Sequence, residues 1–524
     1  MKFALSHKLV QTIVFASFIL ASNAQKLTAQ YSTVPLDHQV YPFLQKAEAQ
    51  QLVQGFALRV LPLSRDLVRE QLQFMNAKRD KLSKADRALL AQMLAEFTDP
   101  EIGQKAPDGS EIHLLRYEEG RSQIFVDARM VQNFRFRQNR LGVEDENISE
   151  TIGLGAIRGR LGKRVHFGLT ARNTMTLGEN ETSENFDPTS GEIVSRTGAA
   201  GFRDQATGYV AAKFGHFGVL IGRNDVSWGS GNFEQLAVSS QNEPLDLIQF
   251  SFEFEKFRLT SFHGNLLGNE TQRYLAGHRL DFAFWKKFQF GVYETLTYGG
   301  RDVELGYVNP FLLFHIMEHQ YGDRDNNVLG FDFSWLPGAG VRIYGELFVD
   351  DFSFNKSPFT YWGNKLAYLI GGHWAQPLGL RTVELFGSYT RVDPWVYTHH
   401  LDHNIYYHYS ASIGSKLGPN ADRFKAGLAI QPLRDTRFEF FFRSIRKGKG
   451  DVFTAHTFED GVEKNFLEGT LEKRREFDLR LRHQIRQDVF AGLGYLSRSR
   501  ENVDLIEGQE TTERYARFFL DVNY

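Results

Sequence analysis

The stretch IQFSFEFE at residues 248–255 alternates large apolar side chains with polar ones. Because successive side chains of a β-strand point to opposite faces, this alternation predicts a strand with one apolar and one polar face. The same period of two recurs from about residue 120 to the end of the chain, with Phe-rich examples at 257–262, 280–284, 288–292, 438–442 and 477–481. A soluble β-sandwich would turn such apolar faces toward a second sheet, and a membrane barrel would turn them toward lipid. The alternation alone leaves both folds open.

The lengths of the connecting segments favour the barrel. Short turns are expected near Gly162, Gly215, Lys256, Lys286, Gly338, Leu378, Arg434 and Gln487. Between them lie longer segments at 138–148, 176–204, 226–245, 267–271, 299–325, 350–363, 392–422, 447–470 and 500–512. Outer-membrane barrels have short periplasmic turns and long external loops around an even number of strands. We therefore expect an all-β transmembrane barrel of about 18 antiparallel strands over residues 122–524.

Two segments refine this strand count. The Tyr-rich segment 405–412 has the composition of a strand, but a membrane strand there would break the alternation of short and long connectors. We therefore place it inside the 392–422 loop, as a local hairpin. The final segment alternates apolar and polar residues up to Tyr524. A terminal aromatic residue on an amphipathic strand resembles the assembly signal of bacterial outer-membrane barrels.

The N-terminal region differs from the rest of the chain. Residues 1–24 combine lysines, a short apolar core and small residues before Gln25, a pattern typical of a secretory signal peptide. Residues 33–103 carry helical periodicity, and we expect three short helices with Asp37, Ser64 and Ser83 at their N-caps. Such a small α-helical bundle buries little surface alone, so we expect it to close the periplasmic mouth of the barrel. Residues 104–121 would connect the two parts.

The composition excludes several classes of protein. The chain has 524 residues, 61 Lys+Arg against 63 Asp+Glu, and no cysteine. The near-zero net charge argues against nucleic acid as a partner. After the first twenty residues, no segment reaches the roughly 18–20 apolar residues that a membrane helix requires. The absence of cysteine excludes disulfides, thiolate zinc sites and cysteine nucleophiles.

No catalytic or metal-binding motif is convincing. The sequence WGSG at 228–231 lacks the Gly-x-Ser-x-Gly pattern of a nucleophile elbow. Residues 323–327 begin like a calcium loop, but Val328 and Ser334 occupy the positions of the required Gly and Glu. Four histidines in one loop lack the regular spacing of a helical metal site: His399, His400, His403 and His408. We expect no enzyme activity, no metal site and no cofactor.

A series of short motifs resembles a known family. The motifs are VPLDH at 34–38 with Tyr41, GR at 222–223, WGSG at 228–231, RYLAGHRL at 273–280, YVNPF at 307–311, DN at 325–326, DD at 350–351 and GPNAD at 418–422. Together they resemble the capsule-assembly Wzi family. Gln39 departs from the aromatic residue expected after His38, and beyond about residue 450 the chain matches only in pattern.

The resemblance implies a function that composition and spacing do not show. Members of this family are outer-membrane barrels with a periplasmic helical bundle, and they act as surface lectins that retain capsular polysaccharide. The implied partners are capsular or extracellular polysaccharide and outer-membrane lipid, with the polysaccharide export machinery as a further candidate. A porin or substrate-selective channel is the alternative, because a barrel of about 18 strands can leave an aqueous pore.

Candidate polysaccharide contacts lie in the long loops. Sugar recognition combines flat aromatic faces with planar hydrogen-bonding groups, and external loops are accessible to a polymer. The candidates are Trp228, Trp362, Trp395 and Tyr397, with Asp350, Asn309 and Asn420 as polar partners. Tyr and Trp also occur at the membrane interface of any barrel, so each aromatic residue has this second interpretation. Trp228 and the segment 309–311 have a third, in which the loop folds back to fill the barrel mouth.

Overall fold

The computed structural model describes residues 32–55, 57–99, 112–142, 144–178, 195–197, 200–268, 270–338 and 340–523. The expected signal peptide at 1–24 lies outside these residues, as does the first part, 104–111, of the expected connector.

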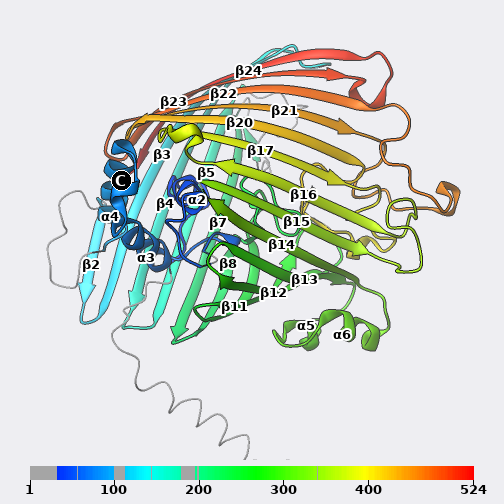
Figure 1. Cartoon of the computed structure of the whole chain (residues 1–524), viewed down its shortest axis with the longest axis horizontal. Helices are drawn as coiled ribbons and strands as arrows, with labels where there is room; N and C mark the ends of the chain where they lie inside the picture. The colour runs from blue at the N-terminus through cyan, green and yellow to red at the C-terminus, as the bar shows by residue number, and fades with distance from the viewer. Residues whose placement is uncertain are drawn as a thin grey trace, which may run out of the picture.

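Eighteen antiparallel strands form a closed barrel, which confirms the predicted fold (Figure 1). Each strand pairs with its neighbours along the chain, and the ring closes between the first and last strands, where Phe518 lies opposite Phe134. The strands are β3 (Ser122–Gln138), β4 (Glu146–Leu161), β5 (Val165–Leu177), β7 (Ala200–Phe214), β8 (Phe217–Asn224), β10 (Leu245–Glu253), β11 (Phe257–Leu266), β12 (Arg273–Trp285), β13 (Phe288–Gly299), β14 (Asn326–Gly338), β15 (Val341–Asp351), β16 (Lys365–Trp374), β17 (Val383–Val392), β20 (Ala421–Leu433), β21 (Thr436–Lys447), β22 (Glu472–Arg486), β23 (Val489–Glu501) and β24 (Glu510–Asn523). Two short strands extend the sheet, β2 (Leu115–Glu119) beside β3 and β6 (Ser195–Thr197) beside β7.

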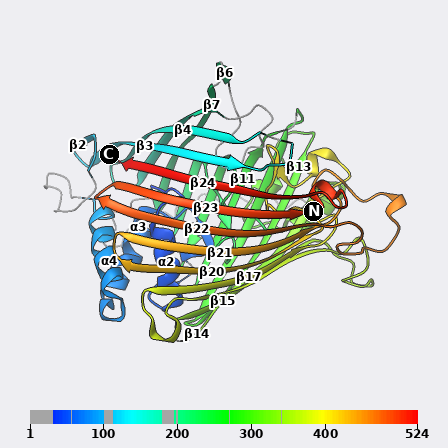
Figure 2. The same ribbon diagram turned by 90° about the horizontal axis from the view of Figure 1, so that it is seen from above.

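The connectors alternate in length as predicted. The short turns lie at the end of the barrel where β24 finishes, which we call the short-turn end, and the long connectors lie at the opposite, long-loop end (Figures 1 and 2). The segment 405–412 is not a barrel strand. It contributes the small hairpin of β18 (Tyr407–His408) and β19 (Ala411–Ser412) inside the long connector between β17 and β20, as the sequence predicts.

Three helices lie at the short-turn end of the barrel: α2 (Val40–Ala49), α3 (Arg65–Asn76) and α4 (Lys84–Glu96) (Figure 1). They share an apolar core and the buried ion pair of Lys46 with Asp86, whose atoms Nζ and Oδ1 are 2.8 Å apart. None of the described helices has the length and apolar character to cross a membrane.

The predicted N-caps are correct for two of these helices. The Ser64 hydroxyl accepts a hydrogen bond from Leu67 N, and the Ser83 hydroxyl accepts one from Asp86 N. The prediction for Asp37 is wrong, because the first helix begins at Val40 after Gln39. The Asp37 carboxylate instead lies 2.6 Å from Nη1 of Arg129 on β3. Its side chain therefore forms an ion pair with the barrel wall and does not cap the helix.

The two faces of the barrel wall have opposite character. Phe134 and Phe518 stack on the outer face and are both exposed, with ring centroids 6.3 Å apart. The adjacent Arg135 points the other way and pairs with Glu150 in the lumen, at 2.8 Å. The wall thus has an apolar exterior and a charged interior, as expected of a barrel surrounded by lipid.

Candidate functional site

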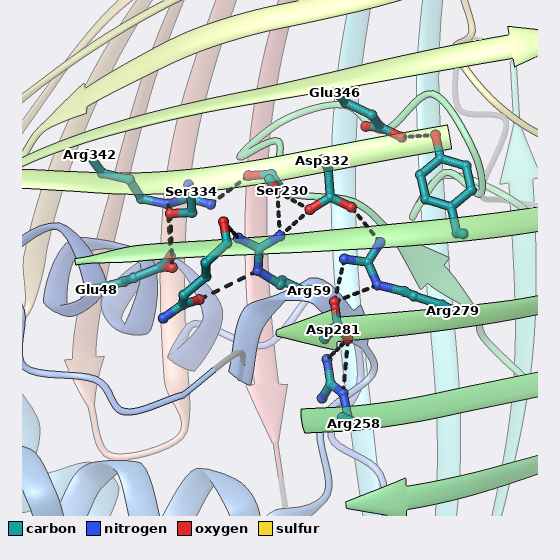
Figure 3. A network of polar contacts seen from close by, with 12 residues as sticks. Glu48, Arg59, Ser230, Arg258, Arg279, Asp281, Asp332, Ser334, Arg342 and Glu346 are labelled. Atoms are coloured by element: carbon teal, nitrogen blue, oxygen red, sulfur yellow. Dashed lines mark hydrogen bonds and ion pairs between the residues drawn. The ribbon is translucent and has the colours of Figure 1, made fainter. Parts of the chain in front are cut away.

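The part of the chain that precedes the barrel, residues 33–103, is called here the N-terminal segment. It enters the lumen at Arg59, which is almost fully buried. Its guanidinium pairs with Asp332 on β14 and donates to Ser230 Oγ at 3.0 Å and to Gln289 O at 3.0 Å. Figure 3 shows that these groups converge from the N-terminal segment, the barrel wall and a long connector. A buried guanidinium requires such partners, because an unpaired charge in this environment costs several kcal/mol.

Further ion pairs continue along the wall beyond Asp332. We call this series of paired charges, from Arg59 to Arg258, the charge ladder. Arg279 on β12 contacts Asp332 at 2.5 Å and Asp281 at 2.6 Å, and Asp281 also contacts Arg258 on β11 at 2.7 Å (Figure 3). Arg279 and Asp281 are two positions apart on β12, so both side chains point to the inward face, where they pair. Positive and negative groups therefore alternate along the inner wall from β11 to β14.

The connector between β8 and β10 folds back into the barrel. Its short strand β9 (Ser227–Trp228) pairs with β1 (Val60–Leu61) of the N-terminal segment. The Trp228 ring is 0% exposed and packs edge-on against Phe262, with centroids 4.9 Å apart. In this conformation Trp228 is interior packing and presents no face to a polymer, which agrees with the interpretation that this loop fills the mouth.

The connector between β17 and β20 packs above this core. The Tyr397 ring is 0% exposed and stacks on Tyr406 at 5.6 Å. Its hydroxyl donates to Leu236 O at 2.9 Å, and its backbone N–H donates to the buried Asp350 carboxylate at 2.7 Å. Tyr397 and Asp350 therefore hold the loop in place, and neither lies on its outer surface.

Asn420 joins two long connectors. Its side-chain oxygen accepts a hydrogen bond from Leu467 N at 2.9 Å, and its side-chain nitrogen donates to Lys449 O at 3.0 Å. Its backbone has φ of 55°, in the left-handed region that Asn tolerates better than most residues. Asn420 is buried, so it too positions the loops.

Two of the predicted aromatic residues do meet at the long-loop end. Trp362, from the connector between β15 and β16, stacks face to face on His456 of the connector between β21 and β22, with ring centroids 3.8 Å apart. Trp395, from the connector between β17 and β20, meets the same imidazole edge-on at 4.8 Å. All three aromatic partners keep exposed surface. We call Trp362, Trp395 and His456, with the adjacent Tyr361, the aromatic cluster.

A buried ion pair joins two of the connectors that carry the aromatic cluster. Lys464 Nζ lies 2.6 Å from the Asp393 carboxylate, and it also donates to the backbone oxygen of Asn364. Trp362 N donates to Val462 O at 3.3 Å, which ties the same connectors together. Neither His456 nor Lys464 is among the candidates from the sequence. Each is a single residue in a loop of mixed composition, and no periodicity or motif marks it.

Asn309 lies apart from the aromatic cluster. It is exposed and sits between α5 (Leu305–Val308) and α6 (Phe314–Tyr321), which pack on the wall at β11 to β14 (Figure 1). Its side-chain oxygen accepts a hydrogen bond from Phe311 N at 3.0 Å. The structure therefore gives Asn309 a local role in the turn between two short helices.

Open space remains inside the barrel among the described residues. One cavity, of about 630 Å³, lies between the N-terminal segment and the wall of β20 to β24 and β3, and it is lined by many arginines. Several of these pair with acidic neighbours; Arg480 Nη2, for example, lies 2.7 Å from Asp478. Another cavity, of about 700 Å³, extends from the wall of β3 to β8 across to β17 and β20 to β22, and it shares part of its lining with the first. The N-terminal segment therefore enters the lumen without filling it completely.

Two of the loop histidines, His399 and His400, stack on each other with ring centroids 4.2 Å apart. Burial lowers the pKa of His408 to about 3, and its Nδ1 accepts a hydrogen bond from Leu267 N at 3.1 Å. Burial likewise lowers the pKa of His399 to about 4. Within the described residues, no group of three or more His, Asp or Glu side chains is arranged to hold a metal ion.

Comparisons with known proteins give one family and one fold. The family described as "Capsule assembly protein Wzi" matches residues 202–514. The solved structure of Escherichia coli Wzi, described as an outer membrane protein involved in group 1 capsule assembly and a carbohydrate-binding β-barrel, aligns with a TM-score of 0.62 at 14% identity, over 94% of this chain and 99% of that chain.

Two further solved structures align less well. Pseudomonas aeruginosa OprD has a TM-score of 0.44 at 11% identity, over 76% of this chain and 95% of its own. Acinetobacter baumannii OccAB1 has a TM-score of 0.46 at 11% identity, over 76% of this chain and 96% of its own. No curated protein sequence gives a significant match. The family match covers more than half of the chain, so the protein belongs to the Wzi family of capsule assembly proteins.

Proposed function

We propose that the protein is an outer-membrane surface protein that binds capsular or other extracellular polysaccharide and anchors it during capsule assembly. The observation that carries this proposal is the aromatic cluster, in which Trp362, His456 and Trp395 come from three separate connectors and meet at the long-loop end. The family to which the chain belongs supports the biological setting.

The membrane orientation follows from the two ends of the barrel. In outer-membrane barrels the short turns face the periplasm and the long loops face the outside. The helices of residues 33–103 would then close the periplasmic mouth, where the export machinery could meet them. The aromatic cluster would face the external polymer.

The chemistry of the aromatic cluster suits a sugar polymer. An indole face stacks on the apolar C–H face of a pyranose, and each buried Å² contributes roughly 25 cal/mol. The Lys464–Asp393 pair and the hydrogen bonds of Asn420 fix the loops, so less conformational entropy is lost on binding. We propose binding without catalysis, with Trp362 and Trp395 as direct contacts and Asp350, Tyr397 and Asn420 as residues that position the loops.

The alternative function is a diffusion channel. The β1–β9 pairing and the Arg59–Asp332 ion pair join the N-terminal segment, a long connector and the wall inside the lumen, which disfavours free passage. Two measurements on the purified barrel separate the functions: glycan-array binding, and ion conductance in planar bilayers. The proposal expects glycan binding with little or no conductance. A steady open-channel conductance without glycan binding would contradict it.

A further inference from the structure

The outer wall of the barrel contains polar residues at the long-loop end of β11 to β13. Arg279 and Asp281 point into the lumen, so the alternating His278 points outward. On the neighbouring strands, His263 and Glu294 also lie on the outer face, with His278 Nε2 2.8 Å from Glu294. Such groups are poorly suited to contact acyl chains.

The connector between β13 and β14 covers these polar residues. The Glu294 carboxylate accepts hydrogen bonds from Phe314 N at 2.9 Å and His315 N at 2.7 Å, at the start of α6. The Phe314 ring stacks on His278 at 4.3 Å. Tyr274, Tyr298 and Tyr307 complete a small apolar core between the helices and the wall. The Glu294 carboxylate thereby gains hydrogen-bond partners, and the polar side chains are removed from the surroundings.

The side of this connector that faces away from the wall is apolar and exposed. Leu305 is 80% exposed, Phe311 68%, Leu313 58% and Ile316 51%. These fractions equal or exceed those of outward-facing barrel residues such as Phe331, at 42%. We call residues 303–321 the α5–α6 segment; Figure 1 shows its helices outside the ring of strands, beside β12 and β13.

The exposed face continues the apolar exterior of the barrel. Phe311 contacts Phe252, an outward residue of β10, with ring centroids 5.4 Å apart. On β12 the uncovered apolar exterior extends only from Leu280 to Trp285, roughly 16 Å along the strand at about 3.3 Å per residue. An outer-membrane barrel needs an apolar band of about 25 Å. The wall alone is therefore too short here, and the α5–α6 segment lies where the band is missing.

The ends of the connector are fixed by polar contacts. Arg301 Nη2 lies 2.6 Å from the Asp325 carboxylate, which also accepts a hydrogen bond from the Tyr307 hydroxyl at 2.7 Å. His319 and Asp323 are exposed near the end of α6. Exposed apolar residues predominate between these ends, with Asn309 and His315 as exposed polar exceptions, which is the amphipathic composition of a segment that lies in a membrane.

We infer that the α5–α6 segment is embedded in the lipid bilayer, with Leu305, Phe311, Leu313 and Ile316 in contact with lipid acyl chains. It replaces the apolar band that is missing on the long-loop part of β11 to β13. It thereby holds this side of the barrel in the membrane, next to the strands that carry the charge ladder in the lumen.

The absence of cysteine from the chain makes a direct test possible. Single variants Ile316→Cys, Phe331→Cys and Phe354→Cys, all at exposed positions, are labelled with an environment-sensitive fluorophore. The full-length proteins are then reconstituted in phosphatidylcholine vesicles that contain lipid brominated on the acyl chain. Phe331 on β14 is the lipid-facing control, and Phe354, 95% exposed in the connector between β15 and β16, is the loop control.

The inference expects the label at position 316 to be blue-shifted and quenched by the brominated lipid as strongly as the label at 331, and several-fold more than the label at 354. A label at 316 that behaves like the one at 354 would place the segment in water and overturn the inference. A label that is blue-shifted but not quenched would also overturn it, because the segment would then be covered by protein, such as a second copy of the chain.

Discussion

Arg59 and Asp332, 273 residues apart in the sequence, form a buried ion pair that joins the N-terminal segment to the barrel wall. Asp332 also pairs with Arg279, so one carboxylate neutralises two guanidinium groups from different parts of the chain. Asp332 therefore links the ion pair of the N-terminal segment to the ion pairs of the barrel wall.

The first prediction concerns this carboxylate. Asp332→Asn leaves Arg59 and Arg279 close together without their shared counter-charge, and we expect a loss of about 3–5 kcal/mol in the free energy of unfolding. Arg59→Met should cost less, because Asp332 keeps its contact with Arg279. The measurement is the midpoint of unfolding, followed by heat-modifiable gel mobility. Asp435→Asn, in the exposed Arg434–Asp435 pair, is the control and should cost under about 1 kcal/mol. Equal losses for all three variants would indicate independent, hydrated charges.

The second prediction concerns closure of the lumen. Deletion of residues 33–103 removes β1 and Arg59 but leaves the connector between β8 and β10 inside the barrel. We expect ion conductance in planar bilayers to rise with this deletion, and to rise further when the connector 225–244 is also shortened. The intact barrel is the control. Conductance that is unchanged by both deletions would show that the long connectors alone close the barrel.

The strand pattern could be predicted from sequence because each membrane strand obeys a strict physical constraint. Phe438, Phe440 and Phe442 must share the lipid face, and Gly215 or Gly338 must turn the chain within a few residues. The same constraint places charged residues two positions apart, such as Arg279 and Asp281, on one inward face, where they can pair.

The candidate site was less predictable because alternation says nothing about where a long connector goes. Trp228 and Tyr397 have the composition of a binding surface, yet both rings are buried where their connectors fold into the barrel. His456 completes the aromatic cluster from a third connector, and only the three-dimensional fold brings it to Trp362. Asp37 has the spacing of a helix cap, but Arg129, distant in sequence, attracts its carboxylate.

The third prediction uses pH. Burial raises the pKa of Asp66, at the start of α3, to about 6, with Glu70 raising it further and Arg69 opposing both. Because the unfolded value is 3.8, the folded state binds the proton more tightly, so stability rises as pH falls from about 8 toward 4. The effect is on the order of 2–3 kcal/mol. Asp66→Asn should flatten this dependence and stabilise the protein at about pH 8. An unchanged slope in thermal unfolding would show that other groups set it.

The last prediction separates polymer contact from loop packing. Trp362→Ala and Trp395→Ala remove rings that keep exposed surface, so we expect weaker polysaccharide binding and less capsule on intact cells, with the unfolding midpoint nearly unchanged. Tyr397→Ala removes a fully buried ring and its hydrogen bond to Leu236 O, and it should lower stability by about 3–5 kcal/mol. Trp335→Ala, an exposed outward residue near the short-turn end, is the matched control for losing an indole. If the folded Trp362→Ala, Trp395→Ala double variant binds polymer as well as the parent, the aromatic cluster is loop packing. The contact surface must then lie elsewhere on the long connectors.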